Sequence, residues 1–203
     1  MPGTQRLRES RSENSHVSKF VLSCDDGCAS DVRVADLCRK YGVEAIFYWP
    51  IEWQSLAYDK DYHPLTYQEA LDIAKDFEIG GHTITHRHLT KMDSADASRE
   101  ICDCKIMLER LFPGKKVTKF CPVRGYTNEA LTRQTLTFYE SQRLTRGEGL
   151  LHIHPNSGAN NNMPWREYAK TIDVKEAWCH SWELNKFNLW DELEEYIREN
   201  YAS

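Results

Sequence analysis

Residues 20–30 read FVLSCDDGCAS, and this stretch decides how the rest of the chain is interpreted. An apolar run at residues 20–22 leads directly into two adjacent carboxylates, Asp25 and Asp26, and then into Gly27. Asp-Gly is a common turn dipeptide, so a solvated turn is the ordinary explanation. The alternative is an active site, because parallel α/β proteins present their reactive side chains where the strands end.

Strand and helix patterns alternate along the whole chain. Strand-like runs are predicted at residues 19–24, 43–50, 78–82, 117–125, 149–155 and 174–182. Helical apolar spacing is predicted at residues 31–42, 66–77, 94–112, 127–139 and 189–200. Thr66 and Glu69 have the spacing of a capping box, which predicts a helix start there. Alternation of this kind favours a parallel α/β architecture, either a barrel or a doubly wound sheet.

The composition fits one compact domain. The 203 residues carry a net charge of −5, which gives no reason to expect nucleic acid as a partner. No run approaches the ~20 apolar residues of a membrane span. Residues 1–16 lack apolar periodicity and are interpreted as a disordered tail, with the domain at residues 17–203. The oligomeric state is not indicated by the sequence.

Seven cysteines are present, an odd number in a domain that is not small. This predicts reduced and mostly buried thiols in a cytoplasmic protein, because disulfides persist mainly in oxidising compartments. The tail has no apolar segment typical of a secretory signal. Export would still be possible if a leader had been removed from this sequence.

His82 and His86 form the sharpest pair of reactive residues. If the segment HTITHRH is helical, residues i and i+4 share a face and both imidazoles can reach one divalent ion. The plain alternative is two unrelated histidines. The preceding Gly80-Gly81 and a nearby carboxylate favour the metal site, because two histidines and one aspartate form an arrangement typical of hydrolytic metal centres.

Asp25 and Asp26 are expected to have separate tasks, because adjacent side chains on an extended backbone point in opposite directions. One can bind the ion and the other can take a proton from the attacking water. His180 lies in an apolar strand-like run. It is either a hydrogen-bonded core histidine or a general acid that protonates a leaving amine. Glu183, three residues further on, can orient it or remain a solvated acid.

The order of these motifs resembles the polysaccharide deacetylase family, the NodB-homology carbohydrate esterases, over roughly residues 18–200. LSCDDG at residues 22–27 is similar to the first motif of that family, and HTITH at residues 82–86 to its second. FCPVRG at residues 120–125 is similar to the third motif, and WCHSWEL at residues 178–184 to the last.

The resemblance implies a distorted (β/α) barrel with roughly seven strands and a metal-dependent hydrolase that removes an N-acetyl group from a sugar. It implies a metal, usually zinc with cobalt or nickel as alternatives, held by Asp26, His82 and His86. It implies Asp25 as general base and His180 as general acid. It also implies substrate or oxyanion contacts at Pro122, at Trp178 and at the backbone N–H of Arg124.

The sequence departs from the family pattern at several positions. Cys121 occupies the place of an arginine that braces the catalytic aspartate, and Arg124 is the nearest replacement along the chain. No clear fourth motif is present, and Trp165 and Asp173 are the nearest candidates. Trp178 stands where a leucine commonly lines the acyl pocket, and its ring would narrow that pocket.

Three hypotheses therefore remain. The first is a deacetylase of an N-acetylated sugar or oligosaccharide. The second is an amidase or deformylase of the same fold that acts on a small intracellular amide. The third is an inactive carbohydrate-binding homologue. His152 and His154 share a face and are interpreted as surface or structural residues, with the substrate groove as the alternative.

Overall fold

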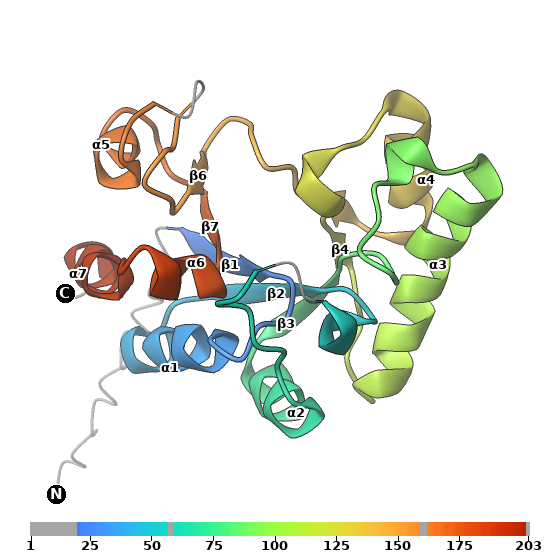
Figure 1. The fold of residues 1–203 in the computed structure, drawn as a ribbon, viewed down its shortest axis with the longest axis horizontal. Helices are drawn as coiled ribbons and strands as arrows, with labels where there is room; N and C mark the ends of the chain where they lie inside the picture. The colour runs from blue at the N-terminus through green and yellow to red at the C-terminus, as the bar shows by residue number, and fades with distance from the viewer. Residues whose placement is uncertain (1–19, 57–58, 159–161, 202–203) are drawn as a thin grey trace, which may run out of the picture.

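The computed structural model describes residues 20–56, 59–158 and 162–201, so the predicted tail at residues 1–16 lies outside the described residues. The described chain forms one seven-stranded sheet in the order β5-β4-β3-β2-β1-β7-β6 (Figure 1). The strands are β1 (Val21–Asp25), β2 (Ala45–Trp49), β3 (Glu78–Gly81), β4 (Lys119–Phe120), β5 (Ser141–Gln142), β6 (Leu150–His152) and β7 (Glu176–His180).

Every paired strand runs parallel to its neighbour. The sheet curls into a half-barrel, and among the described residues no pairing joins β5 to β6. This confirms the predicted distorted (β/α) barrel of about seven strands. Because all strands run the same way, their carboxyl ends lie at one edge of the sheet, and the loops that follow them meet there.

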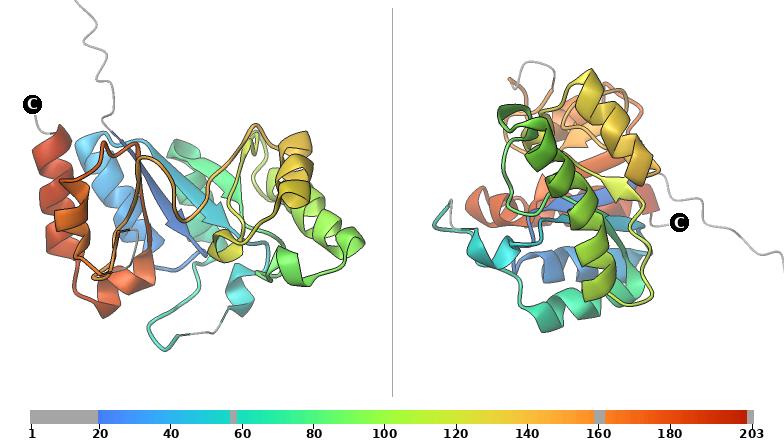
Figure 2. Two further views of the ribbon diagram at one scale, coloured as in Figure 1. Left: turned by 90° about the horizontal axis from the view of Figure 1, so that it is seen from above. Right: turned by 90° about the vertical axis from the view of Figure 1, so that its right-hand side faces the viewer.

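The longer helices surround this sheet. They are α1 (Asp31–Tyr41), α2 (Tyr67–Asp76), α3 (Ser94–Leu111), α4 (Glu129–Phe138), α5 (Trp165–Ala169), α6 (Ser181–Lys186) and α7 (Trp190–Tyr201). Figure 1 shows α1 and α2 together on one side of the sheet, with α7 beside α1 and with α3 and α4 beside β4. Figure 2 shows the same arrangement from above, with α7 and α1 side by side at one end of the molecule.

Local sequence signals explain where the helices begin and end. Thr66 and Glu69 form the predicted capping box: Glu69 N donates to Thr66 Oγ1 at 3.3 Å, and Thr66 N donates to Glu69 Oε2 at 2.9 Å. Gly42 ends α1 with a φ of 69°, a left-handed conformation that glycine adopts without steric cost. Asp93 and Asn128 cap α3 and α4 through their side chains.

The two faces of the sheet differ in character. On the outer face, Leu22, Cys24 and Phe47 pack into the main core with helix residues such as Val34 and Ile197. Residues on the inner face form a separate small cluster of Ile46, Tyr48 and Cys121, with Val21 packed against it. The polar residues Ser23 and Asp25 also lie on this inner face and are buried. The inner face therefore leads from a small apolar base towards buried carboxylates at the strand ends.

Two local expectations need correction. The strand predicted at residues 117–125 contains only Lys119–Phe120, because Pro122 has no N–H to donate to the sheet and the 3-10 turn η3 (Val123–Gly125) follows. The segment after β3 is also not helical. The other short turns are η1 (Trp53–Ser55) and η2 (Leu89–Lys91).

All seven cysteines are free, and six of them are buried. Cys104 is fully buried on α3 whereas Cys102, two residues earlier, is half-buried, so the two thiols lie on different faces of the helix. Among the described residues no helix combines the length and the apolar character needed to cross a bilayer.

Candidate active site

The five reactive residues singled out in the sequence lie in one cavity at the carboxyl ends of the strands. This cavity has a volume of about 690 Å³. Its lining includes Asp25, Asp26, His82, His86 and His180. They come from three separate stretches of chain, which follow or end β1, β3 and β7 and are brought together by the parallel sheet.

Asp26 leaves the extended path of β1. Its φ is 82°, and its backbone N–H donates to Tyr48 O at 3.0 Å. Gly27 follows with a φ of 74°, and a Cβ there would lie 2.9 Å from Trp53 Cβ, so only glycine fits. Left-handed conformations are uncommon for residues other than glycine, although aspartate tolerates them better than most. This turn separates the two carboxylates. The sequence predicts that an extended strand separates them, and the left-handed conformation of Asp26 does so instead.

The HTITH segment is a loop, and the helix considered for it is not formed. Thr83 and His86 both have positive φ, at 71° and 56°. Glu100, on α3, holds the loop: it accepts hydrogen bonds from the N–H groups of Ile84 at 2.7 Å and Thr85 at 2.9 Å. The left-handed conformations of Thr83 and His86 and the carboxylate of Glu100 thus bring the two histidines together. The sequence predicts that the periodicity of a helix does this, and that helix is absent.

His82 and His86 converge on Asp26. The Nε2 atoms of His82 and His86 lie 3.3 Å and 3.0 Å from Asp26 Oδ1. His82 Nδ1 donates to the Cys121 carbonyl at 2.6 Å, which fixes the ring with Nε2 directed at Asp26. Burial opposes charge on Asp26, but His180, His82 and His86 lower its pKa well below the usual range.

These three donors fit a divalent metal. Zinc bonds of about 2.0–2.2 Å in tetrahedral geometry place neighbouring ligand atoms roughly 3.3–3.6 Å apart, close to the separations seen here. The donor atoms of the three residues all lie within 4.8 Å of one another. Two imidazole nitrogens and one carboxylate oxygen suit zinc and related transition metals and leave coordination positions open for water and substrate.

Gly80 and Gly81 have a packing role. A Cβ at Gly80 would lie 2.4 Å from Tyr48 Cδ1, and one at Gly81 would lie 2.6 Å from Tyr139 Oη. The sequence interpretation linked the two glycines to a close backbone approach at the metal. The contacts show instead that they make room for two tyrosine rings, one on each face of β3.

Asp25 is braced by Arg143, a residue that the sequence interpretation missed. Arg143 Nη2 donates to Asp25 Oδ1, and Nε lies 3.4 Å from Glu176 Oε1. The guanidinium lies between two rings, 4.9 Å from the ring centroids of Tyr48 and of Trp178. Burial lowers the pKa of Arg143, but the carboxylate of Asp25 outweighs this effect, and the pKa lies above its usual value.

Arg124 does not replace the missing arginine. It lies in η3 with a φ of 56° and an exposed side chain, at the rim of the cavity. Cys121 is fully buried, and its Sγ lies 3.8 Å from Asp25 Oδ2. The signal that points to Arg143 in the sequence is slight: it is a charged residue that directly follows β5, a strand of only two residues.

His180 stands at the end of β7, directly opposite Asp25 in the register of β1 and β7. Its Nε2 lies 3.5 Å from Asp26 Oδ2, and its Nδ1 lies 2.9 Å from Glu183 Oε2. Burial lowers the pKa of His180, but the charges of Asp26 and Glu183 outweigh this and raise it to about 10. Of the two roles considered for Glu183, its position fits the orienting one.

The remaining predicted residues divide between the cavity wall and its surroundings. Trp178 lines the cavity, and its ring stacks on His152 with the centroids 3.7 Å apart. Pro122 is buried and does not belong to the lining. Trp165 is buried in the main core, and Asp173 pairs with Lys175 at the surface, so neither supplies a fourth motif. Glu176 instead supplies the acid that pairs with the bracing arginine.

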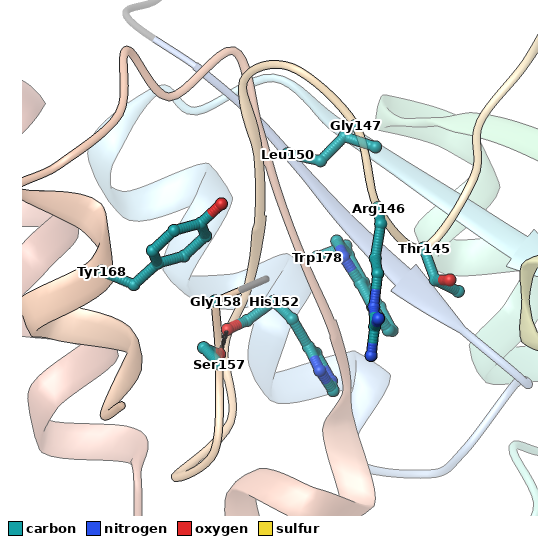
Figure 3. A pocket seen from close by; sticks show the side chains of 9 residues that line it. All are labelled: Thr145, Arg146, Gly147, Leu150, His152, Ser157, Gly158, Tyr168 and Trp178. Carbon is teal, nitrogen blue, oxygen red and sulfur yellow. Dashed lines mark hydrogen bonds between the residues drawn. The ribbon is translucent and has the colours of Figure 1, made fainter. Parts of the chain in front are cut away.

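A second cavity of about 380 Å³ adjoins the first and shares His152, Trp178 and Thr145 with it. Figure 3 shows Tyr168 on one side of this cavity and Arg146 and Trp178 on the other, with His152 between them. The two cavities therefore adjoin at the three residues that they share.

Known structures share the fold at low sequence identity. A carbohydrate esterase family 4 pseudoenzyme from Bacillus anthracis is 17% identical with a TM-score of 0.63, and the match covers 90% of this chain and 62% of that chain. A peptidoglycan N-acetylglucosamine deacetylase in complex with a benzamide compound is 18% identical with a TM-score of 0.63, covering 90% and 83%. A carbohydrate esterase domain of a multidomain xylanase, from the hindgut metagenome of Trinervitermes trinervoides, is 18% identical with a TM-score of 0.62, covering 91% and 85%.

The chain spans 62–64% of the length of the pseudoenzyme structures that it matches. None of the curated proteins compared with it matches. The sequence profile of the family described as polysaccharide deacetylase matches residues 12–140, which is more than half of the chain and includes the DDG and HTITH motifs. The chain therefore belongs to the polysaccharide deacetylase family.

Proposed function

We propose that this protein is a metal-dependent deacetylase that hydrolyses the N-acetyl group of an N-acetylated carbohydrate. The observation that carries the proposal is that Asp25 and His180 line the same cavity as the Asp26, His82 and His86 group. A base and an acid beside one metal-binding group are what amide hydrolysis requires.

Asp26, His82 and His86 would hold the ion through one carboxylate oxygen and two Nε2 atoms. A divalent ion bound there supplies Lewis acidity at the acyl carbonyl and lowers the pKa of a water molecule towards ~7. The hydrogen bond from His82 Nδ1 to the Cys121 carbonyl fixes the ring that presents Nε2. Glu100 fixes the loop that carries His86.

Asp25 would act as the general base that takes a proton from the attacking water. Arg143 holds one oxygen of its carboxylate and supplies the opposite charge, which orients the side chain. His180 would act as the general acid that gives a proton to the leaving amine. Glu183 accepts from its Nδ1 and thereby directs the Nε2–H towards the cavity. We assign the oxyanion contact to the backbone N–H of Arg124, at the rim of the same cavity.

The size of the main cavity supports a sugar substrate over a small amide. Its volume of about 690 Å³ is more space than a formamide or a ureide needs. Tyr126 is half exposed at the edge of this cavity. An aromatic side chain that is open to solvent suits the apolar face of a sugar ring. The known structures with a related fold include a peptidoglycan N-acetylglucosamine deacetylase.

The test is acetate release from chitooligosaccharides and from peptidoglycan fragments by zinc-loaded and chelator-treated protein. We expect release only from the zinc-loaded form and its loss in Asp25→Asn. The matched control is Asp173→Asn, because Asp173 is exposed and remote from the cavity. Absence of acetate from every N-acetylated sugar, with release from small amides instead, would favour the amidase hypothesis. No turnover of any amide would favour an inactive carbohydrate-binding homologue.

A further inference from the structure

A second group of metal-ligand side chains lies beside the proposed centre. It consists of His152 at the end of β6, His180 at the end of β7 and Glu183 on α6. The donor atoms of these three residues lie within 4.8 Å of one another. Glu183 Oε2 is 2.9 Å from His180 Nδ1 and 3.4 Å from His152 Nε2.

We propose that this group is a second, inhibitory site for a divalent transition metal such as zinc. Two imidazoles and a carboxylate are the ligands that zinc takes in proteins, and tetrahedral bonds of about 2.0–2.2 Å place ligand atoms roughly 3.3–3.6 Å apart. The distance from Glu183 Oε2 to His152 Nε2, 3.4 Å, lies within this range, and the distance to His180 Nδ1, 2.9 Å, lies just below it. Small side-chain rotations are therefore enough to admit an ion.

His152 is held ready for this role. Its ring is stacked on Trp178 at 3.7 Å with an interplanar angle of 2°, which fixes the direction of its nitrogen atoms (Figure 3). Its Nε2 is inaccessible to solvent, and the only polar contact found for it among the described residues is the 3.4 Å approach to Glu183 Oε2, which does not form a hydrogen bond. A buried polar atom without a partner is costly, and a bound ion is one of the few things that satisfies it.

His154 lies next to this group without belonging to it. Its Nε2 is 3.9 Å from Glu183 Oε1, beyond hydrogen-bond distance. Its ring lies 5.0 Å from the ring of His152, centroid to centroid, and is nearly parallel to it. Glu183 Oε2 is therefore the oxygen that the two ligand histidines share.

An ion bound here would replace the proton that His180 Nδ1 donates to Glu183. His180 would then be a metal ligand with a single N–H and could no longer deliver a proton as an imidazolium. This consequence rests on the proposed function, in which His180 protonates the leaving amine. Because a positioned general acid contributes about 10²–10⁴-fold to a rate, zinc in excess of one equivalent should slow turnover roughly 100-fold.

The test measures zinc per chain after equilibrium dialysis against buffered free zinc, followed by elemental analysis. We expect two zinc ions in the wild-type protein, one in His152→Gln, one in His86→Gln and none in the double variant. His63→Gln, at an exposed histidine outside both groups, is the matched control and should bind two. Retention of one ion by His152→Gln also shows that this variant is folded.

The outcomes separate this inference from the proposed function. His152→Gln that binds as much zinc as the wild type would overturn the second site and leave the first untouched. Loss of zinc only in His152→Gln, with no effect of His86→Gln, would overturn the first site and support the second. Inhibition by excess zinc should disappear in His152→Gln, and inhibition that persists unchanged in this variant would contradict the proposal.

Discussion

Arg143 donates a hydrogen bond to Asp25 across a sequence separation of 118 residues, and both side chains are buried at the inner face of the sheet. The family arginine expected at position 121 is a cysteine in this chain, yet the aspartate beside it is still paired with a guanidinium. The acid that completes the arrangement is Glu176, on β7. Arg143, which directly follows β5, and Glu176 on β7 thus take the place of the family arginine beside the proposed general base.

Removal of the guanidinium should impair both stability and turnover. Arg143→Met leaves the buried Asp25 carboxylate without its counter-charge, and breaking a buried ion pair by removing one partner typically costs about 3–5 kcal/mol. We expect a lower free energy of unfolding by urea denaturation and a loss of kcat that exceeds any change in KM. Arg133→Met, at an exposed residue of α4, should leave both unchanged. Wild-type kcat in a folded Arg143→Met protein would contradict the role given to this residue.

Restoration of the family arginine should not help. Cys121 is fully buried against Ile46 and Tyr48, and Arg143 already occupies the space next to Asp25. Cys121→Arg would place a second cation there, and overpacking alone costs about 1–3 kcal/mol. We expect a less stable protein with no gain in acetate release, whereas Cys121→Ser should remain folded. A rise in activity on Cys121→Arg would show that Arg143 does not serve as the brace.

Glu100 should control metal affinity without touching the ion. It accepts hydrogen bonds from Ile84 N, Thr85 N and Thr85 Oγ1 and so holds the loop between His82 and His86. Loss of an outer-shell partner typically weakens metal binding about 10–100-fold. We expect a zinc dissociation constant raised by this factor in Glu100→Gln, measured by competition with a chromophoric chelator. Glu129→Gln on α4 is the control, and equal affinities for the two variants would refute the assignment.

The stability of the metal-free protein should depend on the protonation of Asp31. Burial raises the pKa of this carboxyl to about 7, against the hydrogen bonds that it accepts from Ser181, Cys24 and Trp49. An aspartate in the unfolded chain has a pKa of about 3.9, so the folded protein binds the extra proton between these values. The stability due to this group is therefore complete below about pH 4 and is lost as the pH rises through about 7.

This dependence is measured as a difference between the wild-type protein and Asp31→Asn. The free energy of unfolding of the wild type relative to the variant should fall by up to about 1.4 kcal/mol per pH unit between about pH 4 and 7. Urea denaturation in the presence of a chelator, at several pH values in this range, gives the slope. A difference that stays constant with pH would mean that Asp31 is ionised in the folded protein.

Sequence patterns predict the periodic features of this protein well. The alternation of strands and helices, the capping box at Thr66 and Glu69 and the long α3 follow from local side-chain spacing, and all are formed. The position of Asp25, Asp26 and His180 at strand ends follows from the same patterns, because a parallel sheet places these ends at one edge.

Two features of the site lie beyond such patterns. The left-handed conformations of Asp26, Thr83 and His86 give no periodic signal, and the packing around them imposes these conformations. Arg143 follows a strand of two residues and meets Asp25 only through the order of strands in the sheet, which local sequence does not specify. Gly80 and Gly81 illustrate the same limit, since the tyrosine rings that exclude their Cβ atoms come from β2 and from the end of α4.

The proposed function requires that Asp26, His82 and His86 hold one divalent ion within reach of Asp25. An anomalous difference map, recorded at the zinc absorption edge from crystals grown with one equivalent of zinc, locates the ion. We expect the strongest peak at about 2.0–2.2 Å from one Asp26 carboxylate oxygen and from the Nε2 atoms of His82 and His86. A map without a peak between these three side chains would refute the metal site.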